Sequence, residues 1–263
     1  GASNTAVGAA ALGSNTTASD NAAFGKNTLT ANTTGASNVG LGAYALDANT
    51  TASNNVGVGV HALGQTTTGA SNTSIGTASM NDNTTGASNT AVGMNALNAN
   101  TTADTNVAIG MNSMAANTTG ASNTAIGFNS LDANTTANNN TALGYFALSA
   151  NTTGADNVAV GSQSLAASTT GNYNVAVGQL ALNDNTTASN NTAVGYNSLA
   201  ANTTGTRNVA VGTSAGLALT TGSDNVFVGE DCGSAMTTGA NNVFVGSGTG
   251  DDANCSYNVM IGL

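Results

Sequence analysis

Residues 89–105 read NTAVGMNALNANTTADT, and this stretch is one complete copy of a repeat that runs through the chain. Counted from its first residue, the repeat has Asn at position 1, Ala at position 3, a large apolar residue at position 4 and Gly at position 5. Leu follows at position 9 and Asn-Thr-Thr at positions 12–14. The position-1 asparagine recurs fifteen times at a strict interval of 17 residues: Asn4, Asn21, Asn38, Asn55, Asn72, Asn89, Asn106, Asn123, Asn140, Asn157, Asn174, Asn191, Asn208, Asn225 and Asn242. A sixteenth, Asn258, arrives one residue early.

The constant interval predicts a stacked solenoid, because each unit must lie on the one before it. A helix is excluded, since turn-forming residues at positions 5 and 15 leave too few residues between them. We therefore expect an all-β chain, a β-solenoid (β-roll or β-helix) of about fifteen 17-residue coils. Each coil should contain two short strands and two corners. Proline, which would remove a ladder hydrogen bond, is absent.

The apolar positions of the repeat predict the core of each coil. The first strand is expected at positions 1–5, where side chains alternate between two faces. Position 4 is always large and apolar, so we expect it to be buried in every coil, as at Val58, Ile75, Val92, Ile109 and Ile126. Position 9 should form a second buried column, as at Leu97, Leu131 and Leu148. The second strand is expected at the Thr-Thr pair, because β-branched residues suit an extended backbone.

Two or three apolar side chains per coil bury little surface compared with the cost of ordering 17 residues. The remaining stabilisation should come from backbone ladders, from columns of Asn and Thr, and from burial against partner chains. This favours association of the chain with itself, as a parallel homotrimeric fibre or a filament.

Charge and composition exclude several functional classes. Only 5% of the residues are charged, the formal net charge is −10, and Lys26 and Arg207 are the only Lys or Arg residues. Nucleic-acid binding requires many cations to neutralise phosphates and is excluded, and an anionic membrane surface is equally unsuitable. No apolar run is long enough for membrane insertion, and we expect no signal peptide within these residues. Because the chain begins without Met and within a repeat, we expect a segment of a longer extracellular polypeptide.

The repeat changes after residue 207. Residues 1–207 are predicted to form a regular solenoid, and residues 208–263 a continuous series of variant repeats with a repacked core. This second part could be a thicker segment, a cap or a junction. The changes occur at position 9 (Gly216, Gly233, Gly250), at position 12 (Leu219, Met236) and at position 3 (Phe227, Phe244, Met260).

Two strings carry a resemblance to known proteins. NTAVGYNSLAANTTG (residues 191–205) and NVFVGEDCGSAMTTGANNVFVG (residues 225–246) resemble repeats of tail-fibre-domain proteins from phages and marine bacteria. NVAVG (residues 157–161) is more distantly similar to the head repeats of trimeric autotransporter adhesins. The resemblance covers essentially the whole chain and implies a fibre shaft. The adhesin heads imply a trimer of left-handed β-rolls, although their repeat is shorter.

Few residues suggest a chemical site. Cys232 and Cys255 fall in neighbouring coils, where they could form a disulfide or act as small buried fillers. No zinc-type spacing exists, and His61 is expected to be a surface residue. The carboxylates concentrated near the C-terminal end could hold Ca²⁺, but no DxDxDG loop supports this, so a solvated end without metal or cofactor is expected: Glu230, Asp231, Asp251 and Asp252. No paired carboxylates or nucleophile set indicate an enzyme.

Position 6 offers a further candidate. An aromatic and Met column could contact a sugar or a host surface, or could lie in the oligomer interface, which we favour: Met94, Met111, Phe128 and Tyr145, flanked by Phe146.

Ten Asn-Thr-Thr triplets between Asn15 and Asn202 are formal N-glycosylation acceptors, but the triplet is explained by the repeat itself.

Two functions remain open. The first is the shaft of an adhesive fibre on a virion (a tail fibre) or on a cell surface (an adhesin). Such a fibre would reach a host-surface glycan or receptor through domains outside this segment. The second is an ice-binding β-solenoid that uses its stacked Thr columns. Adjacent threonines send one side chain outward and one inward, so each coil would present a single Thr rank to ice.

Overall fold

The computed structural model describes residues 1–250 and 254–262. The described residues contain sixteen three-residue strands and no helix. The chain divides into two compact units, Gly1–Thr136 and Ala137–Leu263. The first unit contains β1 (Thr5–Val7), β2 (Ala22–Phe24), β3 (Val39–Leu41), β4 (Val56–Val58), β5 (Thr73–Ile75), β6 (Thr90–Val92), β7 (Val107–Ile109) and β8 (Thr124–Ile126). The second contains β9 (Thr141–Leu143), β10 (Val158–Val160), β11 (Val175–Val177), β12 (Thr192–Val194), β13 (Val209–Val211), β14 (Val226–Val228), β15 (Val243–Val245) and β16 (Val259–Ile261).

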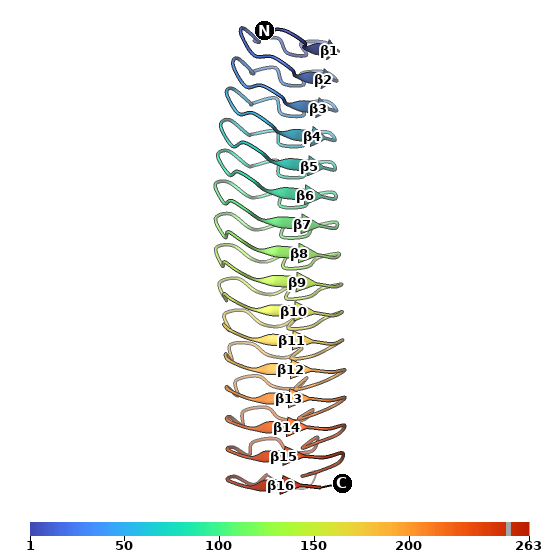
Figure 1. Cartoon of the computed structure of the whole chain (residues 1–263), viewed down its shortest axis with the longest axis vertical. Coiled ribbons are helices and arrows are strands. Elements are labelled where there is room, and N and C mark those ends of the chain that lie inside the picture. The colour runs from blue at the N-terminus through green and yellow to red at the C-terminus, as the bar shows by residue number, and fades with distance from the viewer. Residues whose placement is uncertain (251–253, 263) are drawn as a thin grey trace. The chain divides into compact units, whose positions relative to one another are not determined.

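Within each unit the strands stack in chain order into a parallel sheet, with one strand in each coil (Figure 1). Pairing joins identical repeat positions, so that Val107 lies opposite Thr124 and Ile109 opposite Ile126. The early sixteenth asparagine shortens the last step, where Val243 pairs with Val259. The predicted all-β solenoid with coils of 17 residues is confirmed.

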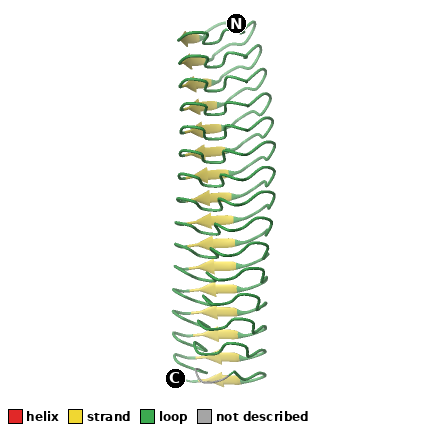
Figure 2. Cartoon of the chain, turned by 180° about the vertical axis from the view of Figure 1, so that it is seen from behind, coloured by secondary structure: helices red, strands yellow, loops and turns green. Residues whose placement is uncertain are grey.

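The predicted second strand does not form among the described residues. Loops occupy the rest of every coil (Figure 2). At the Thr-Thr pair, the backbone N–H groups of Thr84 and Thr85 both donate to the carbonyl oxygen of Thr101, at 2.9 and 3.2 Å. Two successive N–H groups directed at one acceptor require a bend, so this hydrogen bonding overrides the β propensity of threonine.

The side chains of the strand point in the directions opposite to those predicted. Position 3 points inward, since Ala91, Ala108 and Ala125 are fully buried. Position 4 points outward: Ile75, Ile109 and Ile126 are 41%, 38% and 38% exposed, and Val58 and Val92 are partly exposed. The prediction that these five residues form a buried column is therefore wrong.

Position 9 explains this orientation. Leu97, Leu131 and Leu148 are fully buried, as predicted. In the coils before residue 208 a Leu or Met at position 9 fills the narrow interior and leaves room only for a small residue at position 3. Because neighbouring strand side chains alternate, the large residue at position 4 must then lie outside.

Two columns of buried asparagine run along the stack and link neighbouring coils. At position 1, the backbone N–H of Asn106 donates to Asn89 Oδ1 at 2.9 Å, and its own Nδ2 donates to the carbonyl oxygen of Gly120 at 2.8 Å. At position 12, Asn100 Nδ2 donates to Asn83 Oδ1 at 2.8 Å and to the carbonyl oxygen of Ala103 at 3.1 Å. These bonds satisfy polar groups that would otherwise be costly to bury.

The position-12 column is interrupted at Thr66, and the interruption leaves a detectable defect. Asn49 Oδ1 is buried and has no hydrogen-bond partner, because the next coil supplies Thr66 where Asn would donate. We expect Thr66→Asn to restore this bond and to raise the free energy of unfolding by about 1 kcal/mol. The urea midpoint followed by circular dichroism measures the change. Thr68→Asn, at an exposed position of the same coil, is the control, and equal midpoints for the two variants would contradict the prediction.

In the second unit, the variant repeats repack the interior. Phe227 and Phe244 at position 3 are fully buried, with ring centroids 5.8 Å apart. Glycine at position 9 makes room for them: a Cβ atom on Gly233 would lie 2.6 Å from the Phe227 ring. In these coils the large side chain stands at position 3 and the glycine at position 9, the reverse of the regular coils. The side chains of these two positions therefore share one interior volume.

Candidate interaction face

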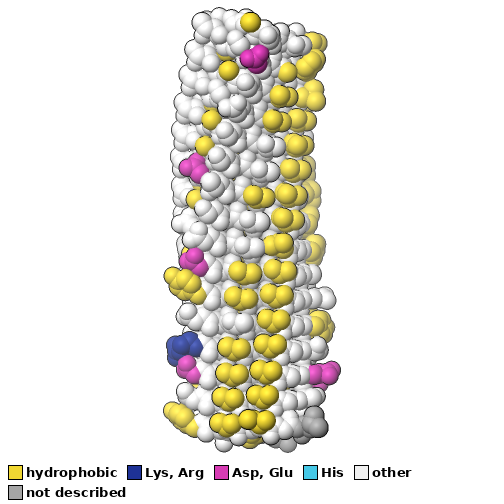
Figure 3. All heavy atoms as spheres, viewed as in Figure 1, with side chains coloured by type: hydrophobic (Ala, Val, Ile, Leu, Met, Phe, Trp, Pro, Cys, Tyr) yellow, Lys and Arg dark blue, Asp and Glu magenta, His cyan; other side chains and the backbone are white. Residues whose placement is uncertain are grey.

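The outward side chains at positions 2 and 4 of the strands form a surface that we call the strand face. Figure 3 shows apolar side chains in ranks over the strands of both units. None of the described strands carries a charged residue. The large apolar residues of the strand face that are 36% or more exposed are, in the first unit, Val7, Phe24, Val39, Leu41, Ile75, Ile109 and Ile126. In the second unit they are Val177, Val194, Val209, Val211, Val228, Val243, Val259 and Ile261.

The composition of the strand face differs between its two ranks. Position 4 is large and apolar in every strand, whereas position 2 holds mainly Val or Thr. Both positions are apolar in most strands of the second unit, where Thr141 in β9 and Thr192 in β12 are the exceptions at position 2. Neighbouring strands lie about 4.8 Å apart, so the face repeats with that period. A flat, uncharged and apolar surface of this kind favours association.

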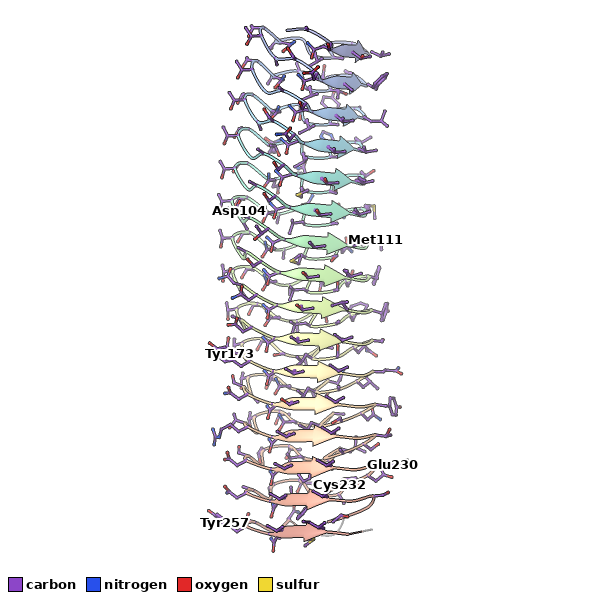
Figure 4. The ribbon with its side chains drawn as sticks, in the orientation of Figure 1. Asp104, Met111, Tyr173, Glu230, Cys232 and Tyr257 are labelled. Atoms are coloured by element: carbon purple, nitrogen blue, oxygen red, sulfur yellow. The ribbon has the colours of Figure 1, made fainter. Side chains whose placement is uncertain are left out.

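The predicted position-6 column lies beside this face, at the surface. In the first unit Met94, Met111 and Phe128 are 47%, 37% and 36% exposed, and Met111 lies at the corner that follows β7 (Figure 4). In the second unit Tyr145 is 55% exposed, and its ring meets Phe146 edge-on at 4.5 Å. The column extends the apolar surface of the first unit from the strands onto the adjoining corner.

A separate wall carries threonine. Position 14 is Thr in each coil from Thr17 to Thr238 and is exposed throughout. Position 13 is mostly half-buried, and its hydroxyl is used within the stack: Thr84 Oγ1 donates to the carbonyl oxygen of Thr101 at 2.9 Å. Each coil therefore presents one exposed Thr rank on this wall. The asparagine of the triplet is buried. In Asn100, for example, Nδ2 donates hydrogen bonds inside the coil, so this glycosylation acceptor is inaccessible in the folded chain.

Cys232 and Cys255 are not joined in the structure, so of the two alternatives that the sequence left open the disulfide does not form here. Cys232 is buried at position 8, where its Sγ donates to the carbonyl oxygen of Phe244 at 3.3 Å (Figure 4). Cys255 is partly exposed and belongs to the column of position 15, since its carbonyl oxygen accepts from Asn242 Nδ2 at 2.8 Å. The two residues stack in different columns of the coil. Cys232 instead matches the alternative of a small buried filler.

The carboxylates that the sequence concentrates near the C-terminal end are only partly described by the structure. Glu230 and Asp231 are exposed, whereas Asp251 and Asp252 lie outside the described residues. Within the ranges that the structure covers, no three His, Cys, Asp or Glu side chains group in a way that could hold a metal.

One exposed ion pair links successive coils at position 17. Arg207 Nε and Nη2 donate to the two carboxylate oxygens of Asp224 at 2.6 and 2.8 Å. Their hydrogen bond and charge lower the pKa of Asp224 and raise that of Arg207. An exposed pair of this kind contributes little to stability.

The structure adds one cluster that we did not predict. His61 is exposed, as expected, but it stacks on Tyr44 with ring centroids 5.0 Å apart and an interplanar angle of 7°. Lys26 Nζ lies 5.7 Å from the centre of the Tyr44 ring. Tyr44 and His61 both occupy position 7, so alignment of the repeats by position would have revealed the pair.

Comparisons with known protein families, curated proteins and solved structures found no match. None of the described residues belongs to a helix that is long and apolar enough to cross a membrane.

Proposed function

We propose that this chain is the structural shaft of an extracellular adhesive fibre, a virion tail fibre or a cell-surface adhesin, that positions a binding tip. The β-solenoid supports this proposal, because stacked coils make an extended scaffold. The observation that carries the proposal is the strand face, which is apolar, uncharged and repeated in every coil.

The partner best suited to this face is another copy of the same chain. Parallel sheets are normally covered on both faces, and here only the inner face is covered within one chain. A partner must match a period of about 4.8 Å over many coils. A parallel copy in the same register has that period by construction. The strand faces of parallel copies would then meet rank against rank.

Two adjoining apolar surfaces favour a trimer over a dimer. A two-fold partner would cover one flat face, which is the strand face alone. In a three-fold fibre each chain contacts two neighbours and needs a second apolar flank. In the first unit Met94, Met111 and Phe128 supply such a flank around the corner from position 4. The homotrimer therefore accounts for both surfaces.

The binding tip belongs to domains beyond this segment in the proposed fibre. The shaft would hold them at a distance from a virion or a cell, and they would engage a host-surface glycan or receptor. The resemblance of residues 191–205 and 225–246 to tail-fibre repeats supports this arrangement. The low charge and the threonine-rich outer wall suit a durable structure exposed to water.

The fibre proposal predicts that charges on the strand face will separate the chains. The double variant Ile109→Glu and Ile126→Glu should reduce the mass by light scattering from three times the 25.2 kDa chain to a single chain. A carboxylate buried without a partner costs several kcal/mol. Thr119→Glu with Thr136→Glu, on the exposed threonine wall of the same coils, should leave the trimer intact. A trimer that survives the first pair of changes would contradict the proposed interface.

Ice binding is the second candidate, and the uninterrupted exposed rank at position 14 favours it. A row of hydroxyl and methyl groups at a constant spacing could order water. An ice-shaping assay on the light-scattering sample separates the two functions. A trimer without effect on ice supports the shaft, whereas a monomer that facets ice would overturn it and make the Thr rank the active surface.

A further inference from the structure

A groove lies on the outer surface of three successive coils of the second unit, at repeat positions 7, 10 and 11 of residues 174–224. These positions lie outside the strand face. The volume of the groove is about 430 Å³, within the range of roughly 300–1,000 Å³ that is usual for small-molecule sites. It is open to solvent, and apolar atoms make up most of its lining, from Leu180, Ala200, Ala201, Leu217 and Ala218. We call it the Ala200 groove.

The repeat explains why the groove occurs in these coils. Leu stands at position 7 only as Leu180 and at position 10 only as Leu217. The coil between them carries Ala200 and Ala201 at positions 10 and 11. Coils repeat about every 4.8 Å, so Leu180 and Leu217 come from coils roughly 10 Å apart. The two alanine methyl groups are too small to fill that interval, which leaves a space between larger side chains.

The backbone of the groove offers few free hydrogen-bonding groups to a ligand. The carbonyl oxygen of Ala200 accepts a hydrogen bond from the backbone N–H of Asp184 at 2.9 Å, and that of Leu217 accepts one from the backbone N–H of Ala201 at 3.1 Å. Polar recognition therefore depends on side chains. Asp184, which is exposed, and Asn197, which is half-buried, both line the groove.

The charge of the groove indicates the kind of ligand that it suits. Asp184 is the only charged residue in the lining. Arg207 is the only Lys or Arg within residues 174–224. Its Nε and Nη2 bind the carboxylate of Asp224 at 2.6 and 2.8 Å, at position 17 rather than at the groove. These coils therefore supply no cation to the groove, and a positively charged ligand would complement Asp184.

We propose that the Ala200 groove binds a small molecule that has an apolar body and one ammonium group, such as an arylalkylamine. The apolar body would lie on Ala200 and Ala201 between Leu180 and Leu217, and the ammonium group would lie against the carboxylate of Asp184. Burial of apolar surface supplies most of the affinity. Since the groove is open and the ligand small, the dissociation constant should be on the order of 1 mM. An exposed ion pair adds about fivefold to that affinity.

Methyl NMR of the full chain, labelled with ¹³C at the leucine methyl groups, tests the site with 2-phenylethylammonium as the probe. The signals of Leu180 and Leu217 should shift, with half-saturation on the order of 1 mM. Those of Leu182, which is fully buried, should not. The neutral analogue 2-phenylethanol should shift the same signals with a half-saturation about fivefold higher. Leu180→Met and Leu217→Met identify the two sets of signals.

Filling the groove should abolish the response to the probe. Position 10 accepts Leu in the next coil, as Leu217, so Ala200→Leu should preserve the fold and weaken binding of 2-phenylethylammonium at least tenfold. Ala115→Leu makes the same change at position 10 of the first unit, outside the groove, and should leave binding unchanged. Equal binding by Ala200→Leu and the unmodified chain would overturn the proposal.

Removing the carboxylate should remove the preference for a cation. Asp184→Asn should bind 2-phenylethylammonium and 2-phenylethanol equally, whereas Asp82→Asn, at the same repeat position of the first unit, should keep the fivefold difference. A preference that survives Asp184→Asn would contradict the assigned role of Asp184. Signals of Leu180 and Leu217 that respond to protein concentration, and not to either probe, would overturn the proposal in favour of a second copy of the chain.

Discussion

Gly93→Ala is expected to lower the free energy of unfolding by at least about 3 kcal/mol. Position 5 closes every strand with glycine, and Gly93 has φ +136°, a backbone conformation that residues with a Cβ rarely adopt. An added Cβ would also lie 2.5 Å from the carbonyl oxygen of Gly110 in the next coil. Neither problem can relax locally, because the same corner recurs directly above and below.

A matched glycine separates backbone conformation from crowding. A Cβ on Gly86, at position 15, would lie 2.4 Å from the carbonyl oxygen of Ala103, yet its φ lies outside the left-handed region. Other coils carry Ala at that position, including Ala52 and Ala103. We therefore expect Gly86→Ala to cost about 1 kcal/mol or less, and urea midpoints compare the two variants. Equal losses would show that crowding, rather than the left-handed corner, makes glycine necessary.

Phe227→Ala is expected to destabilise the second unit by about 3–5 kcal/mol, because it removes one of the largest fully buried side chains. Glycine occupies position 9 of this coil and of the preceding one, so neither of these two coils supplies a position-9 Leu to fill the cavity. Denaturant unfolding measures the loss. Hydrogen exchange should locate it near β14 and β15, where Phe244 packs on Phe227.

Restoring the ordinary core tests the exchange of volume between positions 3 and 9. Gly233→Leu alone should also destabilise, because its Cβ would lie 2.6 Å from the Phe227 ring. Gly233 has φ +62°, close to the +53° of Leu97, so the backbone accepts Leu. The double variant Phe227→Ala with Gly233→Leu should recover at least half of the stability that the two single variants lose together. Strictly additive losses would mean that the two positions do not share one volume.

The candidate interaction face shows where reasoning from the sequence failed. Alternation correctly separates positions 2 and 4 from position 3, but it does not say which set is inside. Both sets are apolar here, with Ala91 buried and Ile109 exposed, so hydrophobicity favoured the larger residue. The strand face was consequently assigned to the core. The orientation depends on the interior volume that is left beside the position-9 side chain. Position 9 lies six residues after position 3 in the coil.

The Tyr44–His61 stack was missed for a related reason. Tyr44 and His61 are one repeat apart along the chain and become neighbours only when the coils stack. An aligned repeat reveals which residues share a column, as it did for Met94 and Met111.

Four features follow from the amino-acid sequence alone, because each rests on a strict period or on a residue kept at one position: the solenoid, the 17-residue coil, the Asn columns and the buried Leu at position 9. Three features emerge only when the coils pack: the strand face that lies inside, the bend at Thr-Thr, and the separation of Cys232 from Cys255. These outcomes depend on how much volume and how many hydrogen-bond acceptors the neighbouring coils leave. A repeat pattern specifies the order of side chains around a coil, whereas packing specifies their direction.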